Sequence, residues 1–180
     1  MRTVRTFFLL LIAGMLFQSC NNSQSLQQYY VDNQANSDFM AIDFHTSMLN
    51  IEEADLDEAQ KEAYQSIRKL NVLAFKLTEE NKQTFEEERI KVREILKNPR
   101  YKDLVKLNSG GIKATVKYLG EEDAIDEVII FGINEEMGFA VVRVLGEDMR
   151  PENVMKLMSV VEQSGAGENS LEALKGFLGQ

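Results

Sequence analysis

Residues 1 to 20 most constrain what this chain can fold into, because they have the three-part layout of an export signal that ends at the only cysteine. Arg2 and Arg5 form a short cationic head, and the run from Phe7 to Phe17 is apolar. A transmembrane helix needs about 20 apolar residues, so we expect this shorter run to be cleaved and not to span a bilayer. With Cys20 at the cleavage site, no disulfide can form within the mature chain, and a packed core must hold the fold.

The sequence Leu16-Phe17-Gln18-Ser19-Cys20 resembles a lipobox, the motif that directs cleavage and lipid modification of bacterial lipoproteins. It departs from the usual pattern at two positions, because Phe17 stands where Leu is commonest and Gln18 where a small residue is usual. The resemblance implies that residues 1–19 are removed and that acyl chains on Cys20 anchor the protein to a membrane. The alternative is an ordinary secretory signal followed by a free cysteine.

Removal of residues 1–19 leaves 161 residues, enough for one domain that buries roughly two thirds of its unfolded surface. The mature part has 18 basic and 29 acidic residues, a formal charge of −11. This charge argues against nucleic acid as a partner, and an acidic surface is repelled by anionic lipid head groups. We therefore expect the lipid on Cys20, and not charge, to hold the protein to the membrane.

The segment from Asn21 to Ser37 is polar, since eleven of its seventeen residues are Asn, Gln or Ser. It predicts a lipidated tether over residues 20–37, a flexible coil that averages on the order of 23 Å end to end. No acidic cluster follows Cys20, which favours a domain that faces the periplasm from the outer membrane. Residues 38–180 then form a single domain.

Periodicity predicts the elements of the first half of this domain. The apolar run from Phe39 to Phe44 indicates a strand. A capping-box pattern, Asp55 with Glu58, indicates a helix whose apolar face is Leu56, Ala59, Ala63, Ile67 and Leu70. A second strand is expected from Val72 to Leu77 and a second helix from about Lys82 to Lys97, stopped by Pro99.

The second half begins with a turn at Asn108–Gly111, after which the period changes to two. Three strands are expected, from Ile112 to Tyr118, from Glu127 to Ile133 and from Phe139 to Leu145. Pro151 suits the first turn of a helix whose Val154, Leu157, Met158 and Val161 face the sheet. A last short helix carries Phe177 and Leu178, which either cover the core or offer a docking surface to a partner.

This order of elements predicts an α+β fold. We expect a mixed β-sheet of about five strands, with a βαβ start and then an antiparallel meander, and with helices packed on one face.

Four segments give the chain a family resemblance: Cys20 after a signal, Phe39–Phe44, Leu70–Phe75, and Phe139–Gly146 before the Val154–Val161 helix. Together they resemble the lipoprotein family catalogued as domain of unknown function 4252, over nearly all of residues 20–163. The resemblance implies no activity, substrate or catalytic residue. A loose association of this family with genes for envelope-stress sigma factors implies a regulatory setting.

Four groups of residues invite a chemical interpretation. His45, the only histidine, lies two residues after Asp43 and suits either a general base or an ordinary strand end. The acidic run Glu52–Glu58 lacks the spacing of a calcium loop and fits a helix N-terminus, and Glu121–Glu127 fits a solvated connection. Met149, Met155 and Met158 suit core packing better than a soft-metal site, so we predict no metal and no cofactor.

The sequence therefore favours a non-catalytic binding or adaptor module, anchored to the cell envelope and directed at an unidentified envelope protein, with stress signalling as one setting. The alternative is a periplasmic hydrolase that acts on cell-wall or glycan substrate through paired carboxylates. The two differ in the surface that they need. A hydrolase requires a cleft with two carboxylates, whereas an adaptor requires an exposed contact surface.

Overall fold

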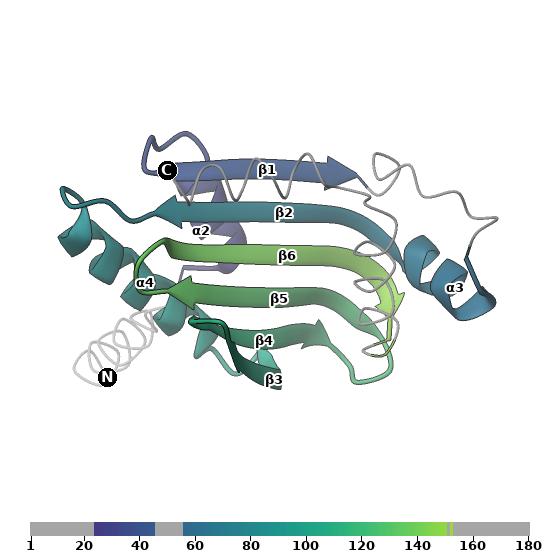
Figure 1. The fold of residues 1–180 in the computed structure, drawn as a ribbon. Helices are drawn as coiled ribbons and strands as arrows, with labels where there is room; N and C mark the ends of the chain where they lie inside the picture. The colour runs from purple at the N-terminus through teal and green to yellow at the C-terminus, as the bar shows by residue number, and fades with distance from the viewer. Residues whose placement is uncertain (1–23, 46–55, 151, 153–180) are drawn as a thin grey trace, which may run out of the picture.

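The computed structural model describes residues 24–45, 56–150 and 152 of the 180-residue chain. In these residues one six-stranded sheet, in the order β1-β2-β6-β5-β4-β3, is accompanied by three helices (Figure 1). The elements in chain order are α2 (Leu26–Asn33), β1 (Phe39–His45), α3 (Glu58–Ser66), β2 (Ile67–Lys76), α4 (Lys82–Leu96), β3 (Lys102–Ser109), β4 (Ile112–Gly120), β5 (Ile125–Asn134) and β6 (Gly138–Met149).

The α+β class is confirmed, but the sheet is antiparallel throughout and not mixed. The predicted succession of strand, helix and strand at the start is present, yet β1 and β2 are antiparallel neighbours, with Phe39 opposite Phe75 and His45 opposite Lys69. A parallel pair would need the connecting helix to cross a face of the sheet. Here α3 lies at the end of the sheet where β1 stops and β2 starts, so the chain turns back instead of crossing over (Figure 1).

Helices α2 and α4 lie on the same side of the sheet, which we call the helical face (Figure 1). Its centre is a cluster of aromatic rings. Phe75 and Phe139, on adjacent strands, stack with their ring centroids 5.4 Å apart, and Phe85 of α4 lies 6.0 Å from each of them. Burial of each such side chain stabilises the fold by about 1.5–3 kcal/mol.

The opposite face of the sheet has a second cluster near α3. Ala63 of α3 is fully buried there, and it packs with Ile67 at the start of β2. The sheet residues of this cluster come from β4, β5 and β6; they are Val116, Tyr118, Ile125, Val128, Val144 and Met149. Both faces of the sheet therefore contribute to the core.

The prediction of a flexible tether through residue 37 is wrong for residues 26–33, which form α2. Ser25 caps this helix, since its Oγ accepts a hydrogen bond of 3.0 Å from the backbone N–H of Gln28. Leu26, Tyr29 and Tyr30 are buried on the helical face. Three apolar residues at this spacing make one narrow stripe, and the rest of the helix is polar except for the exposed Val31. The folded domain thus starts by Leu26 and not at residue 38.

Strand β3 was not predicted, and α3 differs from its prediction at both ends. The cap of α3 is Asp57, which forms a capping box with Gln60, and not Asp55 with Glu58. The helix stops at Ser66, so Ile67 and Leu70 belong to β2 and not to the helix.

The other predicted elements are confirmed within a few residues, namely the strands β1, β4, β5 and β6 and the helix α4. The expected helices over residues 154–161 and after Ser170 lie outside the described residues.

Candidate functional site

A line of polar side chains crosses the helical face beyond the aromatic cluster. Asp43 of β1 is opposite Asn71 of β2, and Asn71 is opposite Arg143 of β6. Residues directly opposite each other in a sheet share a face, so these three side chains form one row. Glu127 of β5 joins it through Arg143. We call Asp43, Asn71, Arg143 and Glu127 the polar row.

Arg143 and Glu127 make a buried bidentate ion pair. Arg143 Nε lies 2.6 Å from Glu127 Oε1, and Nη2 lies 3.1 Å from Oε2. The third nitrogen, Nη1, donates to Oε1 of Gln27 in α2 at 2.6 Å. Every nitrogen of a guanidinium that is only 4% exposed therefore has a partner. The pair fixes the start of α2 against β5 and β6.

Asp43 is the acceptor at the other end of the polar row. It accepts hydrogen bonds from Tyr30 Oη at 2.8 Å, from Asn71 Nδ2 and from Lys69 Nζ at 3.3 Å. Burial alone would raise the pKa of Asp43, but these three donors outweigh it and hold the pKa below its usual value. Burial and the bond to Asp43 raise the pKa of Tyr30, which therefore stays a donor.

Tyr29 repeats this arrangement between α2 and α4. Its hydroxyl donates to Glu88 Oε2 at 2.8 Å, and Lys91 Nζ lies 2.5 Å from the other carboxylate oxygen. Burial, and then the neighbouring Glu88 carboxylate, raise the pKa of Tyr29. Both tyrosines of α2 thus fasten the helix to the domain through protonated hydroxyls.

In these contacts, the polar side chains of the helical face are hydrogen-bonded to one another. A general acid working near neutral pH needs a carboxyl whose pKa is raised. The pKa of Asp43, the carboxyl group at one end of the polar row, is shifted downward. The polar row therefore suits the docking of α2 better than acid catalysis.

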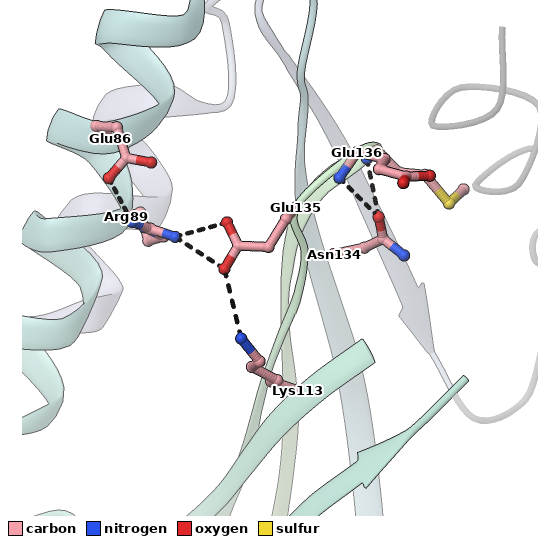
Figure 2. Close-up of polar contacts among 7 residues, drawn as sticks. Glu86, Arg89, Lys113, Asn134, Glu135 and Glu136 are labelled. Atoms are coloured by element: carbon pink, nitrogen blue, oxygen red, sulfur yellow. Dashed lines mark hydrogen bonds and ion pairs between the residues drawn. The ribbon is translucent and has the colours of Figure 1, made fainter. Parts of the chain in front are cut away.

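A second polar site surrounds the turn between β5 and β6 (Figure 2). Arg89 of α4 donates through Nη1 to both oxygens of Glu135, at 3.2 and 2.9 Å, and also contacts Glu86. Lys113 Nζ approaches the same Glu135 at 3.8 Å. The Glu135 carboxylate thus links α4, β4 and the turn. Beside it lies a shallow depression of about 460 Å³, lined by Leu77, Thr78, Glu79, Lys82, Glu135 and Glu136.

The structure separates the residues that the sequence singled out. His45 is exposed at the end of β1, on the same face as Asp43, whose oxygens are occupied by other donors. Asp57 caps α3, in keeping with the helix N-terminus interpretation of its acidic run. Met149 is fully buried in the core, as expected. Glu127 was assigned to a solvated connection, but it is buried in β5.

Several expectations lie outside the residues that the structure describes, among them Cys20, Met155, Met158, Phe177 and Leu178. Within the described ranges, no group of three or more His, Cys, Asp or Glu side chains is placed to hold a metal ion. No helix in the described part of the chain is long and apolar enough to cross a membrane.

The fold defines a class of protein: an α+β domain with one open antiparallel sheet, whose amino-terminal helix is fastened by the polar row. The family described as "Domain of unknown function (DUF4252)" matches residues 29–157, and the chain belongs to this family. The match begins at Tyr29, so it includes both tyrosines of α2. No curated protein and no solved structure matches the chain.

Proposed function

We propose that this chain is a lipoprotein of the bacterial cell envelope, anchored through Cys20, whose domain is a non-catalytic binding or adaptor module. The observation that carries the proposal is an exposed apolar surface at the open edge of the sheet. Val105, Leu107 and Ile112 are 38%, 51% and 48% exposed. We call these three residues of the β3–β4 hairpin the hairpin patch.

The hairpin patch lies on a single face. Val105 is opposite Val116 and Leu107 is opposite Ala114, and Ile112 shares the face of Ala114 and Val116 because alternate residues of a strand do. Among the described strands, β3 is also an edge of the sheet and pairs with β4 alone. Clustered exposed apolar side chains beside an unpaired strand edge are a common feature of protein contact surfaces.

Site-specific photo-crosslinking in cells tests this proposal. A photoreactive residue at Leu107 should capture an envelope protein, whereas one at Asn108, also exposed but on the opposite face of β3, should not. Mass spectrometry of the N-terminal peptide should find acyl chains on Cys20, and Cys20→Ala should abolish both the acylation and the capture. Equal capture from both positions, or none from Leu107, would count against an adaptor that uses this face.

The second candidate is a hydrolase of cell-wall or glycan substrate, and the depression beside Glu135 is the observation that favours it. Glu79, Glu135 and Glu136 line this depression. A hydrolase should release soluble fragments from purified cell wall, and Glu135→Gln or Glu136→Gln should stop the release. The adaptor proposal expects no turnover by either the native protein or these variants.

A further inference from the structure

Because α2 begins at Leu26, the linker between Cys20 and the folded domain is short. Six Cα–Cα steps separate Cys20 from Leu26, so the chain between them spans at most about 20 Å in any conformation. An anchored domain would therefore stay next to the bilayer, with the end that carries Leu26 towards it. This step rests on the proposed lipidation of Cys20.

Basic side chains gather around Leu26 through Tyr101. The backbone N–H of Leu26 donates to Tyr101 Oη at 3.2 Å, and Arg100 Nη2 donates to the same oxygen at 2.7 Å. Lys117 Nζ donates to the backbone carbonyl of Tyr101 at 3.0 Å. Tyr101 thus joins the start of α2 to the end of α4 and to β4, and it brings a guanidinium and an ammonium group to the same end of the domain.

The surrounding segment has the opposite charge from the rest of the chain. Residues 89–117 contain nine Lys or Arg and two acidic residues, a formal charge of +7 in a chain whose total is −9. Arg93 and Lys97 lie one helical turn apart at the end of α4, and Lys106 and Lys117 lie on the α4 side of the β3–β4 hairpin. We call Arg93, Lys97, Arg100, Lys106 and Lys117 the basic end.

Two arginines of the basic end have no carboxylate partner among the described residues. Lys97 pairs with Glu94 at 2.5 Å, and Lys117 pairs with Asp103 at 2.8 Å. Arg93 and Arg100 are exposed and make no ion pair with any carboxylate of the described residues. Positive charge therefore remains available to an external anion at the end of the domain from which the chain leads to Cys20.

We propose that the basic end lies against the bilayer and binds the phosphate groups of anionic phospholipids. Basic side chains are attracted to such a surface only within about a Debye length, roughly 8 Å, and the short segment after Cys20 lets the basic end reach it. The acidic remainder of the domain is repelled by the same surface. Anchor and charge together fix one orientation, which leaves the hairpin patch free, because Val105 and Leu107 are on the face opposite Lys106.

The mature chain, coupled through its only thiol at Cys20 to a maleimide lipid in vesicles, tests the proposal without depending on lipidation in the cell. A water-soluble amine-acetylating reagent then reports which lysines the bilayer covers. Lys97 and Lys82 are matched reporters at opposite ends of α4: they are 70% and 60% exposed, and each pairs with a Glu three residues earlier.

On vesicles that contain phosphatidylglycerol, acetylation of Lys97 should be several-fold slower than on phosphatidylcholine alone, and acetylation of Lys82 should be unchanged. Arg93→Gln together with Arg100→Gln should remove the protection of Lys97. The control pair Lys61→Gln and Arg68→Gln removes the same charge elsewhere and should preserve the protection, with circular dichroism confirming that both variants fold.

Equal rates at Lys97 and Lys82 on anionic vesicles would overturn the proposal, and so would protection of Lys97 by inorganic phosphate without vesicles. A different measurement, the acylation of Cys20 in cells, tests the proposed function independently of the vesicle experiment. An unacylated Cys20 in protein from cells would contradict the natural anchor, but it would leave the vesicle result intact.

Discussion

Asp43 links the ionisation of a single side chain to the docking of α2. Its pKa in the folded domain is lowered, because the donors from Tyr30, Asn71 and Lys69 outweigh the effect of burial. The stability that this carboxylate contributes is therefore fully present above its unfolded pKa, about 3.9, and is lost as the pH falls through the lower folded value.

We expect Asp43→Asn to make the free energy of unfolding less dependent on pH in this acidic range. At neutral pH the substitution should cost about 1 kcal/mol, because a half-exposed carboxylate loses its charge-assisted hydrogen bonds. Urea unfolding between neutral and acidic pH measures both effects. Glu147→Gln is the control, since Glu147 is exposed and pairs with Arg68 of β2, away from α2. Parallel pH curves for the native protein and Asp43→Asn would contradict this role.

The ion pair of Arg143 with Glu127 should matter for stability far more than an exposed pair. Arg143→Leu leaves a buried carboxylate without its partner, so we expect a loss of about 3–5 kcal/mol. The double variant Arg143→Leu with Glu127→Leu should recover part of this loss, because no buried charge remains. Arg68→Leu is the control: its pair with Glu147 is more than 60% exposed, so about 0–1 kcal/mol is expected. Denaturant unfolding of the three variants and the native protein measures the differences.

At the scale of elements, a glycine allows the β5–β6 hairpin to pack closely against β2. Gly138 has a φ of +128°, and a Cβ there would lie 2.0 Å from the carbonyl oxygen of Phe75. Gly138→Ala should therefore destabilise the domain by several kcal/mol, because the β5–β6 turn must move away from β2.

Gly110 provides the matched control for this substitution. It also has a positive φ, +58°, but apart from its two neighbours in the chain no residue has an atom within 4 Å of the place where its Cβ would be. Gly110→Ala should cost only about 1–2 kcal/mol, the penalty of the left-handed backbone. Thermal unfolding followed by circular dichroism compares the two variants. Equal losses would mean that backbone strain alone, and not the collision with Phe75, explains the need for glycine at position 138.

The elements that the sequence predicted best have a regular pattern along their own length, as β4 and α4 do. Strand β3 lacks such a pattern, because a register shift between Asp103 and Val105 interrupts the alternation of apolar and polar residues. Helix α2 shows only three buried residues among polar ones. So narrow an apolar stripe does not predict a packed helix unless the sheet against which it packs is known.

The polar row could not be predicted from the sequence either, because its contacts join residues that are far apart in the chain. Glu127 stands in an acidic stretch typical of a solvated connection, and its burial depends on Arg143, sixteen positions later. Strand register, which no local pattern specifies, also brings Asp43 to Asn71 and Asn71 to Arg143. Capping of α3 near the predicted acidic run could be anticipated, since a capping box is contained within four consecutive residues.

For the whole molecule, the first residue of the folded domain decides how much of the preceding chain is left as a linker. The buried side chains of Leu26, Tyr29 and Tyr30 cover the helical face, and α2 supplies partners to Asp43, Glu88 and Arg143. Without this helix, one face of the aromatic cluster would be open to water, Asp43 would lose the donor Tyr30, and Arg143 would lose the acceptor Gln27. The domain therefore includes α2 as a structural part.

Two truncated chains test this view of the domain. A chain that begins at Gln24 retains α2 and should unfold at the same denaturant concentration as a chain that begins at Cys20. A chain that begins at Asp38 loses three buried side chains, each worth about 2–5 kcal/mol, out of a typical total stability of about 5–15 kcal/mol. It should be unfolded or bind a hydrophobic dye, as measured by near-UV circular dichroism and dye fluorescence. A cooperative transition at an unchanged midpoint in the shorter chain would show that α2 does not contribute to the stability of the sheet. It would then favour the prediction of a flexible tether that extends to residue 37.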